Sequence, residues 1–182
     1  MKSPLKKILI PALITITAIF SVVYTSCNRD KCKTIVCAYG GVCNQGSCIC
    51  PAGYEGTNCE TISNQKFLGN WQVFEKGSTT NAAQYEISIN VDTPVTTVTI
   101  TNFHNYFLSP VTAYVNHDTL TIPNQEMEGK VIFGVGYIYT SSTYGQYGAI
   151  SMRYEFIDTA TGLVDDFGYY PEDLSLPSAW NK

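Results

Sequence analysis

The residues of this chain with the most distinctive chemistry are its seven cysteines. Six of them lie between Cys32 and Cys59, separated by four, five, four, one and eight residues. Thiols gathered in this way form disulfides or bind zinc, and zinc sites commonly use CxxC pairs or histidines. The segment contains neither a CxxC pair nor a histidine. We therefore predict three disulfides, although the spacing alone leaves their pairing open.

The end of this segment resembles the epidermal growth factor (EGF)-like module. The resemblance rests on the pattern Cys48-x-Cys50-x-x-Gly53-Tyr54-x-Gly56-x-x-Cys59. It implies a small disulfide-rich module over residues 32–60. It also implies a pairing, which is Cys32–Cys43, Cys37–Cys48 and Cys50–Cys59. So short a segment needs such cross-links because it cannot bury a sufficient core.

Many modules of this family bind calcium through acidic and amide residues that precede the first cysteine. Here Lys31 stands directly before Cys32. Calcium takes six to eight oxygen ligands, and the sequence does not supply them. We interpret Asp30 and Asn44 as ordinary surface residues, and we expect no metal.

The seventh cysteine, Cys27, follows an export signal. Residues 1–26 combine three lysines with a long apolar run, which is typical of a signal peptide. Tyr24-Thr25-Ser26 before Cys27 resembles the lipobox of bacterial lipoproteins, which implies that Cys27 is acylated. Residues 27–31 would then be a short tether to the membrane. The alternatives are simple secretion with a free thiol and an uncleaved membrane anchor.

The charge of the chain excludes one class of partner. The formal net charge is −4, and removal of residues 1–26 leaves eight Lys and Arg against 15 Asp and Glu, a charge of −7. An acidic protein of this kind is not expected to bind nucleic acid.

No set of residues predicts catalysis. His104 and His117 each stand alone near a strand end, and we expect them to be solvated. Asp165-Asp166 and Glu172-Asp173 could be read as paired carboxylates of a glycoside hydrolase, but neighbouring residues on a strand point to opposite faces. We interpret them as a solvated acidic edge. We predict no catalytic residue, no cofactor and no enzymatic activity, and a hydrolase is a remote alternative.

From Phe67 onward the sequence alternates between apolar and polar residues with a period of two. Ile150, Met152 and Tyr154, for example, share one face. The pattern and its turn signals predict eight strands, at residues 67–75, 84–92, 95–103, 111–116, 119–123, 130–140, 149–158 and 164–170. We predict an all-β, antiparallel, roughly eight-stranded barrel, with a β-sandwich as the alternative. The acidic segment from Asp165 to Lys182 is expected to wrap the outside or fray.

Gly69-Asn70-Trp71 is similar to the G-x-W opening of lipocalin-like barrels. In that family the tryptophan closes one end of the barrel and packs near an arginine from the last strands. The resemblance implies that Gly69 and Trp71 have this closing role, with Arg153 as the arginine. It assigns residues 67–182 to a lipocalin-like barrel domain, after a linker at residues 61–66.

These observations predict a non-enzymatic protein anchored to a bacterial membrane, at the outer membrane or cell surface, through lipidated Cys27. An EGF-like spacer would present a barrel that binds an apolar small molecule or a partner protein. The alternative is an adhesin or glycan-binding module that uses exposed tyrosines. Seven tyrosines are concentrated in the C-terminal half, at positions 137, 139, 144, 147, 154, 169 and 170.

Overall fold

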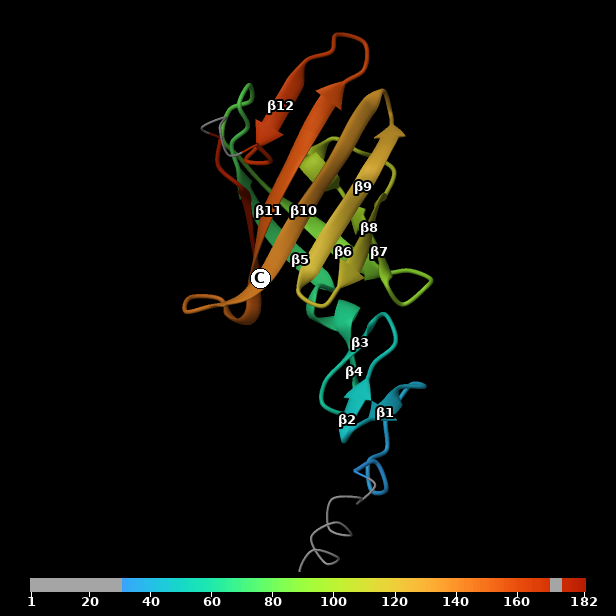
Figure 1. Ribbon diagram of the computed structural model, residues 1–182. Helices are drawn as coiled ribbons and strands as arrows, with labels where there is room; N and C mark the ends of the chain where they lie inside the picture. Colours follow the sequence, from blue (N-terminus) through green and yellow to red (C-terminus); the bar gives the residue numbers. More distant parts are fainter. Residues whose placement is uncertain (1–30, 171–174) are drawn as a thin grey trace, which may run out of the picture.

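The structure is a computed structural model that describes residues 31–170 and 175–182. It is an all-β protein in which a small disulfide-rich module precedes a larger barrel (Figure 1). Cys27, Asp30 and residues 1–26, which were predicted to be an export signal, lie outside the described residues. Within the described ranges, no helix has the length and apolar character needed to cross a membrane.

The module consists of two short hairpins held by three disulfides. The first hairpin pairs β1 (Val42–Asn44) with β2 (Ser47–Ile49), and the second pairs β3 (Tyr54–Glu55) with β4 (Thr61–Ile62). The disulfides join Cys32 to Cys43, Cys37 to Cys48 and Cys50 to Cys59. This is the pairing that the EGF-like resemblance implied.

A one-turn 3-10 helix, η1 (Ser63–Lys66), leads from the module into the barrel. The barrel strands follow, with a second short 3-10 helix, η2, after the third of them. Their bounds are β5 (Gly69–Glu75), β6 (Ala83–Val91), β7 (Thr97–Thr101), η2 (Phe103–Asn105), β8 (Val111–Asn116), β9 (Thr119–Met127), β10 (Lys130–Ser141), β11 (Gly145–Asp158), β12 (Val164–Phe167) and β13 (Ser178–Asn181).

Eight of these strands form a closed antiparallel ring. The order around it is β10-β9-β8-β7-β6-β5-β13-β11, and β11 pairs with β10 to complete it. The alternative of a two-sheet sandwich is therefore wrong. Alternating residues point into the ring, as the period-two pattern predicted: on β5, Trp71 and Val73 are buried while Gln72 and Phe74 are exposed.

The ring closes differently from the prediction. The last predicted strand, residues 164–170, contains β12, which pairs with Tyr154–Ile157 of β11 and lies beside the ring. The ring is closed by β13, which pairs with both β11 and β5. This segment was expected to wrap the outside or fray. It enters the ring because Trp180 and Ser178 point inward and are almost fully buried.

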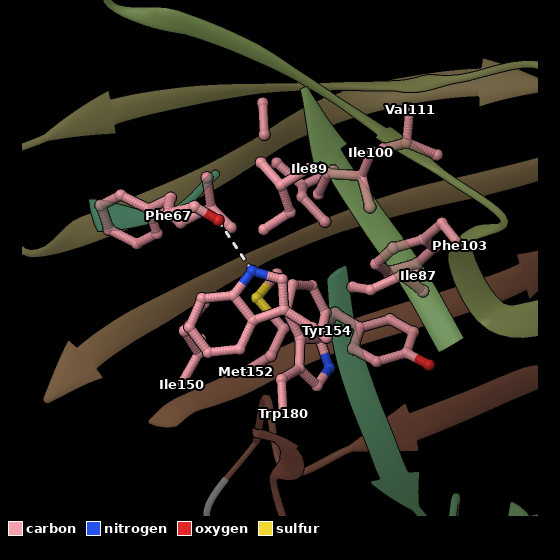
Figure 2. Close-up of a cluster of buried hydrophobic side chains, with 14 of the residues drawn as sticks. Phe67, Ile87, Ile89, Ile100, Phe103, Val111, Ile150, Met152, Tyr154 and Trp180 are labelled. Atoms are coloured by element: carbon pink, nitrogen blue, oxygen red, sulfur yellow. Dashed lines mark hydrogen bonds between the residues drawn. The ribbon is translucent and has the colours of Figure 1, made fainter. Parts of the chain in front are cut away.

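Large side chains fill the barrel. The largest fully buried residues belong to one continuous cluster, and they are Trp71, Trp180, Tyr154, Phe67, Phe103 and Phe167. Figure 2 labels Trp180, Tyr154, Phe67 and Phe103 among them. Each such residue contributes roughly 1.5–3 kcal/mol by leaving water. Inward-facing Gly134 and Gly136 on β10 make room for this core, since a Cβ at Gly134 would lie 2.5 Å from the Cβ of Tyr154. The interior is therefore a packed core.

Candidate functional site

A buried carboxylate lies at the end of the barrel away from the module. Glu75 is the last residue of β5, in phase with the inward-facing Trp71 and Val73, and it is 8% exposed. Its Oε1 accepts a hydrogen bond from the Tyr85 hydroxyl at 2.6 Å. Its Oε2 accepts from the Ser178 hydroxyl at 2.7 Å and from the Tyr154 hydroxyl at 2.9 Å.

His104 is the fourth partner of this carboxylate. Its Nδ1 lies 3.2 Å from Oε1 of Glu75 and 2.9 Å from the Tyr154 hydroxyl. Because the Tyr154 hydroxyl donates to Glu75, it accepts from His104, so Nδ1 carries a proton. The expectation that His104 is solvated is wrong: its ring packs 4.3 Å from that of Phe156.

The backbone that delivers His104 is strained. Asn102, His104 and Asn105 all have positive φ angles, between 48° and 59°. Residues other than glycine rarely adopt this conformation, and such strain persists only where the surroundings hold it. Here the buried partners of the His104 ring hold it. His117, by contrast, is exposed in the β8–β9 turn, where its Nδ1 lies 2.8 Å from the side-chain oxygen of Asn116.

The electrostatics of the cluster favour a charged carboxylate. Burial by itself raises the pKa of Glu75, but hydrogen bonds from His104, Tyr85 and Ser178 outweigh it and hold the pKa below its usual value. Burial and the adjacent Glu75 charge raise the pKa of Tyr85 far above its ordinary value. Burial likewise raises the pKa of Tyr154. At neutral pH, Glu75 is ionised and both tyrosines are protonated.

Four groups surround Glu75, two at each oxygen: three hydroxyls donate to it, and the fourth contact is the Nδ1–H of His104, which the Tyr154 hydroxyl shares. An ionised carboxylate offers about four lone-pair sites, so the protein itself uses its whole acceptor capacity. A general base needs a lone pair directed at a substrate proton, and this carboxylate has none to spare. The cluster is therefore suited to holding η2, β6, β11 and β13 together rather than to proton transfer.

The sequence contained a signal for this cluster that the predictions missed. Glu75 continues the inward phase of Trp71 and Val73, and Tyr85 continues that of Ile87 on β6. Polar residues in an apolar phase indicate a buried network. Ser178 could not have been found in this way, because its strand was not predicted.

The three residues predicted to close the barrel lie on two strands: Gly69 and Trp71 on β5, and Arg153 on β11. Trp71 is fully buried, and its indole nitrogen donates to the Phe67 carbonyl at 2.7 Å (Figure 2). Gly69 precedes it with a φ of +110°. The cation over the Trp71 ring is Lys182, whose Nζ lies 4.4 Å from the ring centroid. Burial lowers the pKa of this lysine.

Arg153 does not have the predicted role. It alternates with the inward-facing Met152 and Tyr154 on β11, so it points outward. Its guanidinium donates to the Gly168 carbonyl at 2.7 Å and so holds the segment that follows β12. Lys182 takes the place expected for Arg153 because β13 brings the last described residues back to β5.

Asp165 and Asp166 are buried, so the expectation of a solvated acidic edge is wrong for them. They point to opposite sides of β12 and bind different segments. Asp165 accepts from the Thr79 backbone amide at 2.7 Å, in the loop after β5. Asp166 accepts from the Gly168 and Tyr169 amides at 3.0 and 2.9 Å. Both acids are loop anchors. Glu172 and Asp173 lie outside the described residues.

The module and the barrel meet through η1. Lys66 donates to Glu55 of the module at 2.8 Å and also to Asp118 in the β8–β9 turn. Burial by itself lowers the pKa of Lys66, but its hydrogen bonds to the two carboxylates outweigh this effect and raise it. Asn64, also buried, donates to the Val95 carbonyl at 2.8 Å.

The outside of the β10–β11 hairpin is rich in tyrosine. Tyr137 and Tyr139 point outward from β10 and are 52% and 49% exposed. Tyr144 follows in the turn, and Tyr147 follows on β11, where the Nζ of Lys66 lies 5.3 Å from its ring centroid. We call these four residues the tyrosine surface. Of the other C-terminal tyrosines, Tyr154 fills the core, and Tyr169 packs against Phe133 with ring centroids 5.0 Å apart.

No known protein-family model matches this chain. In the described part of the chain, no three His, Cys, Asp or Glu side chains are grouped closely enough to hold a metal ion. The candidate sites are thus the Glu75 cluster inside the barrel and the tyrosine surface outside it.

Proposed function

We propose that this protein is a non-enzymatic, lipid-anchored protein of a bacterial envelope. Acylated Cys27 would hold it at the outer membrane or cell surface, an EGF-like module would act as the spacer, and a lipocalin-like barrel would be presented to a partner. The partner is a protein that binds the tyrosine surface.

The observation that carries this proposal is the contrast between the inside and the outside of the barrel. The inside is filled by aromatic residues, and the Glu75 carboxylate is saturated by protein donors. This favours recognition on the outside over an apolar small molecule in the interior. It also gives no support to a hydrolase.

The composition of the hairpin supports a protein partner. Residues 137–148 read YIYTSSTYGQYG and contain no charged residue. Tyrosine supplies a large contact area for little conformational entropy, and serine, threonine and glycine supply adaptable polar contacts. Protein interfaces are enriched in tyrosine and depleted of charge at their core.

Photo-crosslinking in the native host tests the binding surface. A photoreactive phenylalanine derivative would replace Tyr139, and in a matched control it would replace Asn90. Asn90 is also exposed, but it lies on β6, four strands from β10 around the ring. We expect a discrete protein adduct from position 139 and none from position 90.

Two results would contradict the proposed partner. One is equal cross-linking at both positions. The other is an apolar molecule retained by the folded, uncrosslinked protein in native mass spectrometry. Adducts of position 139 with polysaccharide alone would contradict a protein partner and support the alternative, in which the tyrosine surface binds glycans.

The anchor is tested separately by Cys27→Ser. The parent protein should carry the mass of acyl chains and partition into detergent, whereas the variant should do neither. Durable anchoring needs several acyl chains, so a protein without them should not partition into detergent. Equal partitioning of the two proteins and equal acyl mass would refute lipidation at Cys27.

A further inference from the structure

We propose that the open face of the β1–β2 hairpin is a second membrane contact, which lies on the lipid surface and orients the barrel away from it. This inference rests on the proposed acylation of Cys27. It adds a site on the module itself, in which Val42 and Ile49 would enter the lipid, while Lys31 and Lys33, at the start of the module, would meet its headgroups.

The hairpin has one cross-linked face and one open face. Cys43 and Cys48 point to the first face, where disulfides tie them to Cys32 and Cys37. Val42 and Ile49 are direct cross-strand partners on the other face, so their side chains are adjacent. They are 65% and 58% exposed.

The tether brings this hairpin close to the membrane. The Cβ of Lys31 would lie 3.2 Å from a Cβ placed on Gly46, in the β1–β2 turn, so the chain enters the module beside this turn. Cys27 precedes Lys31 by four residues, which can span at most about 14 Å. The hairpin also occupies the half of the module away from the barrel (Figure 1).

The charge distribution favours the same orientation. Residues 31–54 contain Lys31 and Lys33 and no acidic residue, whereas residues 67–182 contain four Lys and Arg against 12 Asp and Glu. Anionic headgroups attract lysines near the surface and repel an acidic barrel. Two adjacent apolar side chains, on a segment whose only charged residues are lysines, match the chemistry of a bilayer interface.

Tryptophan quenching by brominated lipid tests the contact. The full acylated protein would be reconstituted into vesicles of phosphatidylethanolamine and phosphatidylglycerol with brominated acyl chains, which quench only tryptophans close to the acyl region. The variants are Ile49→Trp and, as a control, Leu163→Trp. Both native residues are 58% exposed, but Leu163 lies in the β11–β12 turn, on the barrel.

We expect brominated lipid to quench the added fluorescence of Ile49→Trp at least about twofold. The Leu163→Trp variant and the parent protein, whose Trp71 and Trp180 are buried in the barrel, should be unaffected. Adding Lys31→Glu and Lys33→Glu should reduce the quenching of Ile49→Trp in these anionic vesicles.

Mass spectrometry of the same samples separates the two ways in which the proposal can fail. If Cys27 carries acyl chains and Ile49→Trp is quenched no more than Leu163→Trp, the hairpin contact is wrong and the anchor stands. If Cys27 carries no acyl chain, the anchor is wrong and the hairpin contact is lost with it.

Discussion

At the scale of single residues, Glu75 shows how the barrel tolerates a buried charge. An ionised carboxylate in a protein interior is costly unless hydrogen bonds compensate for lost water. Tyr85, Tyr154 and Ser178 each donate to it, and His104 supplies the fourth contact. The residues come from four separate elements, so the carboxylate fixes their relative positions.

We predict that Glu75→Gln destabilises the protein by about 2–4 kcal/mol at pH 7, measured by urea denaturation. The amide replaces an acceptor oxygen with a donor that faces hydroxyl donors. Glu126→Gln, at an exposed position on β9, is the control and should change stability by less than about 0.5 kcal/mol. Equal effects of the two substitutions would show that the Glu75 network contributes no stability.

The same carboxylate predicts a pH dependence. Because the folded pKa of Glu75 lies below its ordinary value of 4.5, its ionisation stabilises the fold at pH values above the unfolded pKa. This stabilisation is lost as the pH falls through the folded pKa. The urea midpoint of the parent protein should therefore fall more steeply below about pH 4.5 than that of Glu75→Gln. Parallel curves for the two proteins would contradict this expectation.

At the scale of elements, the alternation of apolar and polar residues predicted most of the strands but not β13. Eight predicted strands correspond to β5–β12 because each of those segments carries several alternating residues or sits between turn signals. β13 has only four residues, in an acidic segment with two prolines, so its alternation of Ser178, Ala179 and Trp180 was too short to notice. Its position is set by long-range contacts of Trp180 with the core.

The sequence likewise predicted some of the side-chain contacts and missed others. The disulfide pairing followed from the EGF-like pattern, and burial of Trp71 agreed with the G-x-W resemblance. The partner of Trp71 did not follow, because Arg153 lies in the outward phase of its strand and Lys182 arrives only when β13 closes the ring. The position of His104 depends on a strained loop conformation, for which local sequence gives little signal.

We predict that Trp180→Ala lowers the free energy of unfolding by about 3–5 kcal/mol, because it empties a large volume in the core and weakens the strand that closes the ring. Ala179→Ser, on the outer face of the same strand, should cost less than about 0.5 kcal/mol. Urea denaturation of both variants measures the difference. If Trp180→Ala fails to fold while Ala179→Ser does, the closing role is supported; closely similar midpoints would contradict it.

At the scale of the whole molecule, the joint between module and barrel sets the orientation of one relative to the other. Gly53 of the module approaches Val95 in the β6–β7 turn, and its carbonyl accepts from the Ser63 amide at 2.9 Å. Lys66 adds ion pairs to Glu55 and Asp118 on the two sides. The joint is therefore a packed contact that fixes the module against the barrel.

We predict that Gly53→Ala loosens this joint, because its Cβ would lie 2.5 Å from Cγ1 of Val95. Gly40→Ala is the matched control. The φ angles of Gly53 and Gly40 are +88° and +79°, so both substitutions impose similar backbone strain, but Gly40 has open space around it. Proteolytic cleavage within residues 60–66 should therefore be faster, by about tenfold, in Gly53→Ala alone. Thiol titration should find all three disulfides intact in both variants. Equal cleavage rates would mean that the close packing of Gly53 against Val95 does not hold the joint. The ion pairs of Lys66 with Glu55 and Asp118 would then suffice to hold module and barrel together.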